Sequence, residues 1–317
     1  MSRIFDALQK SEVERSGSGA TTLSAAADLL QLVERQSVSA WEAAGKTGRE
    51  NKSQTAVAVE EQGAVEETLV DGDENGFPEF PALQVSLSPK SQLVSLTDNE
   101  SLASEKFRFL GVRLRHLRRE RQLKKVLITS TVPHEGKSMV AANLAYTLAR
   151  KRQQRTLLLE GDLRRPSLST LFGIKKVPGI CEWLQGEQRS LDNIYRLDGM
   201  DLWFLPAGSH LTNPLELMQS ARLPDLMEQL SSMFEWIIID SPPVLPLADT
   251  SVWSRIADGI LLVTRQGTTE KTQLVRGLEA LDHQKLIGTL LNSSQSSARS
   301  EYYYAYSSSS TGAALSK

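Results

Sequence analysis

The 317-residue sequence contains a single cysteine, Cys181, so it can form neither a disulfide within one chain nor a zinc site built from cysteines. It also has no apolar run near the roughly 18 residues that a membrane-spanning helix requires. Its first residues, MSRIFDALQKSE, are amphipathic and lack the apolar run of a secretory signal peptide. These absences exclude disulfide-rich and membrane-spanning classes, and we expect a cytoplasmic protein.

Charge of one sign is absent from one stretch of the chain and nearly absent from another. No Lys or Arg occurs from Ser53 to Pro89, where acidic residues accumulate, and Glu120 is the only acid in the basic run 111–125. Over the whole chain, 36 Lys and Arg balance 38 Asp and Glu, and no aromatic residues interleave with the basic run, so nucleic acid is not an expected partner. The basic run is either a solvated helix face or a contact for a neighbouring subunit, for acidic or phosphorylated segments, or for an anionic membrane surface.

The first 91 residues differ in composition from the rest. Residues 1–12 are either a frayed terminus or a short amphipathic docking helix with Ile4, Phe5 and Leu8 on one face. Residues 13–91 are rich in Ser, Ala, Gly, Thr and Glu, and such a segment cannot bury enough apolar surface to offset its ordering entropy. We therefore expect a largely disordered acidic linker there, and a flexible tail over residues 293–317.

Between these segments, short apolar runs alternate with longer stretches. The runs are KVLITS (125–130), TLLLE (156–160), DLWFL (201–205), EWIIID (235–240), GILLVT (259–264) and LIGTLL (286–291). The intervening stretches are long enough for crossover helices, of which 138–152 is the clearest, and a helical stretch over 100–121 precedes the first run. This pattern predicts an α/β domain over residues 92–292, with a mostly parallel sheet flanked by helices.

A phosphate-binding loop follows the first predicted strand, in the segment TSTVPHEGKS. At a strand-to-helix junction, backbone N–H groups face the phosphates, Lys137 reaches the outer ones and the Ser138 hydroxyl ligates magnesium. Thr131 stands where the usual pattern has its first glycine, and His134 is expected to shape the loop rather than act as a base. The predicted nucleotide-binding residues are Thr131, Pro133, Glu135, Gly136, Lys137, Ser138 and Met139.

Carboxylates end two later strands. Glu160 and Asp162 follow TLLLE, and Asp240 ends EWIIID. Parallel strands bring their carboxyl ends to one edge of the sheet, so acids there lie beside the loop and can hold magnesium directly or through water. Alternatively, Glu160 or Asp162 caps the next helix. The predicted magnesium site consists of Ser138, Asp162 and Asp240.

Together these motifs resemble the bacterial tyrosine kinases, relatives of the MinD/ParA-type P-loop ATPases. The resemblance covers about residues 92–306 and is carried by the P-x-E-G-K-S loop at 133–138, DLRRP at 162–166, IIIDSPP at 237–243, LPAG…NPLEL at 205–217 and the closing tyrosine cluster. Two departures stand out. Glu160 replaces the family's usual Asp, and Gly111 occupies the third position of an assembly motif whose first two positions are Glu105 and Arg108.

The resemblance implies a tyrosine autokinase that uses ATP and Mg²⁺, with the catalytic set Lys137, Glu160, Asp162 and Asp240. Glu160 is then the carboxylate nearest the acceptor hydroxyl, and Arg164 and Arg165 neutralise phosphate charge or pair with the acids. It implies oligomerisation through Glu105 and Arg108, and a tail that is phosphorylated on Tyr302, Tyr303, Tyr304 and Tyr306.

The implied pathway is exopolysaccharide or capsule assembly. The expected partners are a separate membrane-bound activator, which recruits the chain to the inner face of the membrane, and a cognate tyrosine phosphatase. Two rival functions remain open from the sequence. One is a MinD/ParA-like ATPase switch without kinase activity, and the other is a non-catalytic ATP-binding regulator of chain length.

Overall fold

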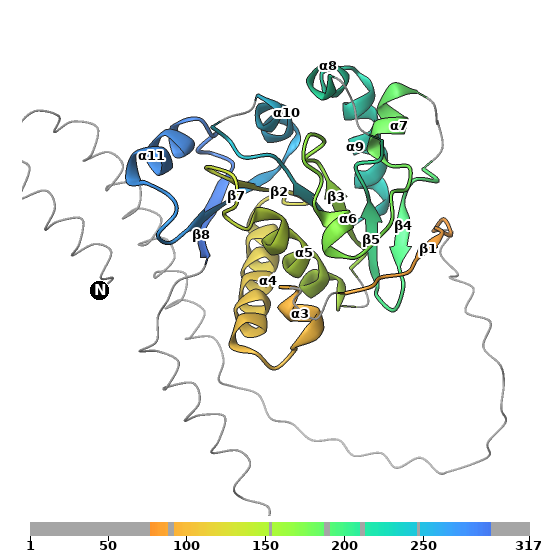
Figure 1. Ribbon diagram of the computed structural model, residues 1–317, viewed down its shortest axis with the longest axis horizontal. Helices are drawn as coiled ribbons and strands as arrows, with labels where there is room; N and C mark the ends of the chain where they lie inside the picture. The colour runs from red at the N-terminus through yellow and green to blue at the C-terminus, as the bar shows by residue number, and fades with distance from the viewer. Residues whose placement is uncertain are drawn as a thin grey trace, which may run out of the picture. The chain divides into compact units, whose positions relative to one another are not determined.

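The computed structural model describes residues 77–87, 92–151, 154–186, 191–209, 213–245 and 248–292. They form an α/β domain around an eight-stranded sheet with the order β1-β4-β5-β3-β6-β2-β7-β8 (Figure 1). The predicted docking helix, most of the predicted linker and the predicted tail lie outside the described residues.

The six predicted apolar runs all form strands, which confirms the predicted α/β class. They become β2, β3, β5, β6, β7 and β8, and each pairs with its neighbour among them in parallel. The sequence did not predict β1 and β4, which are short, and β4 runs antiparallel to β5. The strands are β1 (Ala82–Leu83), β2 (Lys125–Ser130), β3 (Thr156–Glu160), β4 (Tyr195–Leu197), β5 (Leu202–Leu205), β6 (Trp236–Asp240), β7 (Gly259–Arg265) and β8 (Leu286–Asn292).

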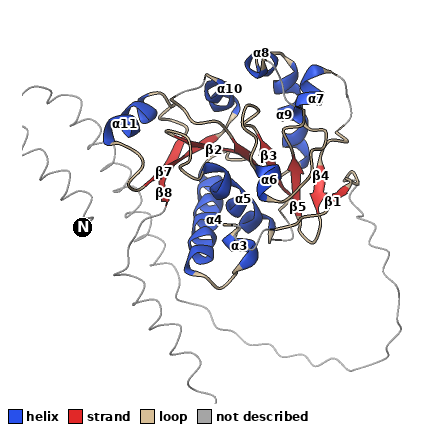
Figure 2. Ribbon diagram, viewed as in Figure 1, coloured by secondary structure: helices blue, strands red, loops and turns tan. Residues whose placement is uncertain are grey.

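Helices cover both faces of the sheet (Figure 2). One face carries α3 (Val94–Thr97), α4 (Leu102–Glu120), α5 (Lys137–Ala149) and α6 (Leu168–Leu171). The other carries α7 (Ile180–Gln185), α8 (Pro214–Met218), α9 (Arg222–Met233), α10 (Asp249–Ile256) and α11 (Lys271–Glu279). Within the described ranges, no helix is both long and apolar enough to cross a membrane.

The sheet divides the core into two layers because side chains alternate along each strand. In β2, Val126 and Ile128 pack with α4 and α5, whereas Leu127 packs with the helices of the opposite face. All of these side chains are fully buried. The continuous apolar character of the strands therefore follows from burial on both faces, as expected for a parallel sheet.

Residues 77–87 belong to this domain, which corrects the predicted linker boundary at residue 91. Phe77 packs edge-on against Trp203 and Phe234, with ring centroids 5.3 and 5.7 Å away, and the Arg155 guanidinium lies 3.9 Å from its ring centroid. In addition, β1 pairs with β4 in parallel. Isolated aromatic residues in a Ser- and Glu-rich segment gave no periodic signal, so composition alone missed this packing.

A chain that starts at residue 92 should therefore be less stable than one that starts at residue 77. The shorter chain loses β1 and the Phe77 contacts, and the loss of such packing costs roughly 3 kcal/mol or more. For a domain of about 200 residues, this corresponds to a melting temperature lower by roughly 6–12 °C. Thermal unfolding of the two chains followed by circular dichroism checks the prediction, and equal melting temperatures would contradict it.

Candidate functional site

The phosphate-binding loop connects β2 to α5 at the carboxyl edge of the sheet. Gly136 caps α5 with a left-handed backbone (φ 94°), and a Cβ there would collide with the side-chain amide of Asn292. Glycine is therefore required at this position on both counts. His134 is also left-handed (φ 67°), which agrees with a role in shaping the loop.

Glu135 is built into the loop and does not point out of it. Its carboxylate is fully buried, accepts the Val132 N–H at 2.8 Å and accepts the Thr269 hydroxyl. The Asn292 amide donates to the Glu135 carbonyl at 2.9 Å, so the end of β8 is tied to the loop. Glu135 thus fixes the loop conformation from within. No sequence motif marked Thr269 or Asn292 as members of this site.

Lys137, the first residue of α5, lies between two carboxylates. Its ammonium is 3.0 Å from Asp162 Oδ2 and 3.6 Å from Asp240 Oδ1. Burial disfavours the charged ammonium, but the charges of Asp240 and Asp162 outweigh burial and raise the pKa of Lys137. The structure thus brings together the loop lysine and two of the three carboxylates that the sequence assigned to this edge.

Asp240 is fully buried at the end of β6. Burial raises the pKa of its carboxyl group to about 6, although Lys137 and Ser138 act in the opposite direction. Neither carboxylate oxygen has a hydrogen-bond partner among the residues that the structure describes. A buried acceptor without a hydrogen bond is costly even beside the Lys137 charge, which makes the position suitable for a bound group.

The oxygen atoms around Asp240 suit magnesium. Asp162 is 4% exposed, and its second oxygen accepts the Arg165 N–H at 3.1 Å. The Ser138 hydroxyl lies 3.3 Å from Lys137 Nζ and 2.8 Å from the hydroxyl of Ser167. In the described part of the chain, no three or more His, Cys, Asp or Glu side chains are grouped so that they could hold a metal ion by themselves. A site of one or two carboxylates, a hydroxyl and substrate phosphate is the arrangement that magnesium commonly uses.

Glu160 has a different environment from the other two acids. It is fully buried, and Oε1 accepts the N–H groups of Leu168 and Ser169 at 2.6 and 3.2 Å. Oε2 accepts the Ser169 hydroxyl at 2.9 Å and the Ala207 N–H at 3.1 Å. Four hydrogen bonds occupy this carboxylate, so its geometry supports the alternative in which it caps the start of α6.

The segment that carries Asp162 is clamped from α10. Gly161 has no room for a side chain, because a Cβ would lie 2.8 Å from the Asp240 carbonyl oxygen and 2.9 Å from the Trp253 ring. The indole N–H of Trp253 also donates a hydrogen bond to the Gly161 carbonyl at 3.0 Å. Arg164 forms a bidentate ion pair with the buried Asp249, in which Nε lies 2.5 Å from Oδ2 and Nη2 lies 3.1 Å from Oδ1. Arg164 therefore pairs with none of the three acids that the sequence offered it. The sequence did not predict a role for Asp249 or Trp253, because they lie in an ordinary amphipathic helix.

The predicted assembly residues lie away from this loop, on α4. Glu105 and Arg108 pair with each other on α4, and Arg108 also donates to the Asn99 side chain at 2.9 Å. The predicted acceptor tyrosines lie outside the described residues. The described chain ends at Asn292, whose side chain is bonded to the phosphate-binding loop.

No protein-family model matches the chain. The tyrosine-protein kinase YwqD of Bacillus subtilis is 34% identical over 214 residues, which cover 67% of this chain and 90% of that kinase. ExoP of Rhizobium meliloti, a succinoglycan biosynthesis transport protein, is 34% identical over 185 residues, or 56% of this chain and 23% of ExoP. The crystal structure of the chimerical protein CapA2B2 matches with a TM-score of 0.60 at 28% identity, covering 68% of this chain and 94% of that one. The identity to YwqD over nearly its whole length, together with the loop and carboxylates described above, shows that the chain belongs to the bacterial tyrosine-protein kinases.

Proposed function

We propose that this kinase transfers the γ-phosphoryl group of ATP to the tyrosines of its own C-terminal tail. The observation that supports this most directly is the position of Lys137 between Asp162 and Asp240 at the start of α5. A lysine ammonium held among acids beside a phosphate-binding loop suits phosphoryl transfer, where most of the catalytic effect is positioning and charge stabilisation.

Ser138, Asp162 and Asp240 are the residues proposed to hold magnesium. When bound, this ion neutralises charge on the β- and γ-phosphates. With the ion held by these residues, the Lys137 ammonium, which pairs with Asp162 and Asp240 in the structure, would be available to the outer phosphates. The tyrosine oxygen bonds to the γ-phosphorus, the bond from that phosphorus to the bridging oxygen breaks, ADP leaves and the phenolic proton passes to solvent.

Phosphotyrosine mapping by mass spectrometry tests this proposal. The purified chain is incubated with ATP and Mg²⁺, with EDTA in a parallel sample. We expect phosphate on Tyr302, Tyr303, Tyr304 and Tyr306 in the first sample only, with recovery when Mg²⁺ is added back in excess. A tail that stays unmodified in the presence of Mg²⁺ would contradict the proposed acceptors, whereas full modification in EDTA would contradict the proposed metal.

For Glu160 we propose a positioning role. Glu160→Gln places an NH₂ group against N–H donors of Leu168, Ser169 or Ala207, which should lower the free energy of unfolding by about 1–3 kcal/mol. Glu160→Asp should be destabilised too, because the shorter arm cannot reach these partners together. Urea denaturation measures both variants, with the exposed Glu228→Gln as the matched control. If Glu160→Gln is as stable as the parent but forms no phosphotyrosine, the residue is catalytic.

We further propose that the kinase acts in exopolysaccharide or capsule assembly, as an oligomer recruited to the inner face of the membrane by a membrane-bound activator. A tyrosine phosphatase would reverse the modification. The likeness to ExoP, whose name refers to succinoglycan biosynthesis, supports this context. Deletion of the gene that encodes this chain should reduce the amount of surface polysaccharide. Complementation with the Lys137→Met variant should fail to restore that amount. Unchanged polysaccharide in the deletion strain would contradict the pathway.

A further inference from the structure

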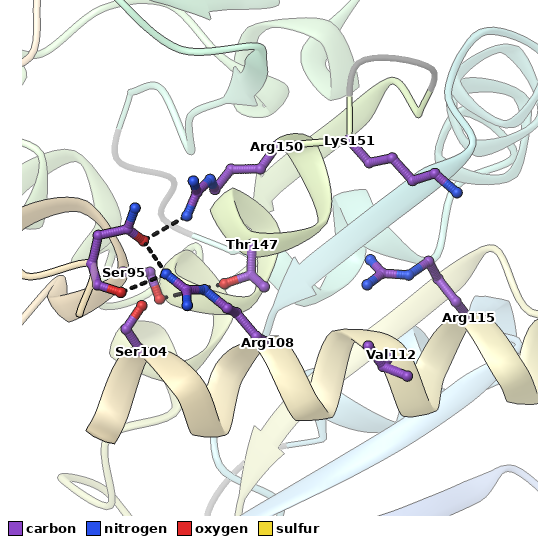
Figure 3. A pocket seen from close by; sticks show the side chains of 9 residues that line it. Ser95, Ser104, Arg108, Val112, Arg115, Thr147, Arg150 and Lys151 are labelled. Atoms are coloured by element: carbon purple, nitrogen blue, oxygen red, sulfur yellow. Dashed lines mark hydrogen bonds between the residues drawn. The ribbon is translucent and has the colours of Figure 1, made fainter. Parts of the chain in front are cut away.

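A second pocket lies between α4 and α5, away from the nucleotide site (Figure 3). Its volume is about 420 Å³, within the range of small-ligand sites. Residues Arg108 and Arg115 of α4 line it from one side, and Arg150 and Lys151 line it from the end of α5. Since α5 begins at Lys137 and rises about 1.5 Å per residue, Arg150 lies about 20 Å from the catalytic lysine along the helix.

The pocket carries a strong positive charge. No Asp or Glu lines it, and of its four cations only Arg108 has a carboxylate partner, Glu105, among the described residues. Arg108 and Arg150 converge on one acceptor, Asn99 Oδ1, at 2.9 and 2.5 Å (Figure 3). Cations gathered in this way favour an anionic occupant.

The chemistry of the lining fits an aryl phosphate. Guanidinium groups bind phosphate oxygens through paired charge-assisted hydrogen bonds, and several arginines directed at one space match a dianion. Val112 lines the same pocket and is 57% exposed, so an aromatic ring would find an apolar contact beside the charges. An aryl phosphate is also what the proposed reaction produces at the tail.

The tail has the length to reach the pocket. The described chain ends at Asn292, which is bonded to the phosphate-binding loop near the start of α5. Tyr302 and Tyr306 lie 10 and 14 residues further on in the sequence. A flexible chain of 10 to 14 residues spans about 17–21 Å on average. This matches the separation of about 20 Å along α5, and a tether whose average span equals the distance gives the highest effective concentration.

From these observations we infer that the pocket formed by Arg108, Arg115, Arg150 and Lys151 binds phosphotyrosines of the C-terminal tail. The inference rests on the proposed function, which supplies the phosphates. Phosphorylation adds about −1.5 to −2 charges per tyrosine, so the modified tail is repelled by Asp162, Asp240 and ATP and attracted to this pocket. Because Arg108 is also the residue assigned to assembly, a captured phosphate would compete with contacts to a neighbouring subunit.

A labelled peptide with the sequence of residues 297–310 tests the inference. It is synthesised with and without phosphate on its four tyrosines and titrated into the full Lys137→Met chain, whose own tail we expect to be unphosphorylated. We expect the phosphopeptide to bind at least about tenfold more tightly than the unmodified peptide, and ADP with Mg²⁺ not to displace it. In Lys137→Met chains that also carry Arg115→Gln and Lys151→Gln, phosphopeptide affinity should fall about tenfold or more, since one lost charge-assisted contact approaches that factor.

The matched control carries Arg113→Gln and Arg119→Gln. These substitutions also remove two positive charges, but from exposed positions of α4 that do not line the pocket. The control should retain the parent affinity. Equal losses in the control and the pocket variant, displacement by ADP, or equal binding of the two peptides would overturn the inference.

Occupancy by the chain's own tail is measured with the unmutated kinase. The autophosphorylated chain should bind added phosphopeptide several-fold more weakly than the same chain after phosphatase treatment, and equal affinities would refute capture of the tail. Because the peptide is synthetic, the two proposals can fail separately. An unmutated chain that forms no phosphotyrosine contradicts the proposed function, whereas the binding data address the pocket alone.

Discussion

Lys137→Met should reduce ATP turnover and tyrosine phosphorylation by roughly 100- to 1000-fold. The ammonium is the only cation recorded between Asp162 and Asp240 in the described structure, and it is the group that we propose contacts the phosphates at the start of α5. Removal of one preorganised charge or donor that stabilises a transition state typically costs that factor. ATP hydrolysis and phosphotyrosine formation, each measured at saturating ATP, check the prediction.

The control for this variant is Lys175→Met, which removes the same charge from an exposed loop position. It should keep the parent rates. If Lys137→Met retains activity within tenfold of the parent, the loop does not bind the reacting phosphates and the assignment of the site is wrong.

The same variant should remain folded, with a stability defect that depends on pH. Asp240 already has a pKa raised to about 6, above the usual value of 3.8, so its charged form opposes folding and stability falls as the pH rises through this window. Without Lys137 the buried carboxylate loses its nearest cation and its pKa rises further. The melting temperature of Lys137→Met should therefore fall below that of the parent by more at pH 8 than at pH 5.

The sequence predicted the strands well where their side chains are completely buried. The continuous apolar runs predicted β2, β3, β6 and β7, because strands buried on both faces tolerate only such residues. Their carboxyl ends then had to meet at one edge, and this is how Asp162 and Asp240 come to lie beside Lys137. The meeting of parallel strand ends at one edge of the sheet therefore accounts for the position of both carboxylates beside the lysine.

Contacts made by single side chains were not predictable in this way. Phe77 joins the core from a Ser- and Glu-rich segment because one aromatic residue suffices to fill a space beside Trp203 and Phe234. Asp249 holds Arg164 from a helix whose sequence shows only amphipathic spacing. Glu160 is one methylene longer than the aspartate that the family pattern has at this position, and its four hydrogen bonds are visible only in three dimensions. Pairwise partners of this kind leave no periodic trace in the chain.

Phosphorylation of the tail should occur between subunits. The described chain ends at Asn292, beside the subunit's own phosphate-binding loop, and Tyr302 lies ten residues further on in the sequence, about 33 Å at full extension. Distance therefore permits transfer within one subunit. However, the four acceptor tyrosines lie within the five successive positions 302–306, and a tail tethered next to the site would offer each of them a different tether length. A neighbour's tail can shift along the site one tyrosine at a time, so we expect transfer in trans to modify all four.

Mixing two complementary chains separates these routes. One is the full Lys137→Met chain, which keeps its tyrosines, and the other is an active chain that lacks residues 302–306. We expect phosphotyrosine on the Lys137→Met tail at a rate that rises with the concentration of the active chain, because the step is bimolecular. The control replaces the active chain with a Lys137→Met chain that also lacks residues 302–306, and it should give no signal. A tail that stays unmodified while the truncated partner turns over ATP would confine phosphorylation to single subunits, since both the acceptor and a working site were then present together.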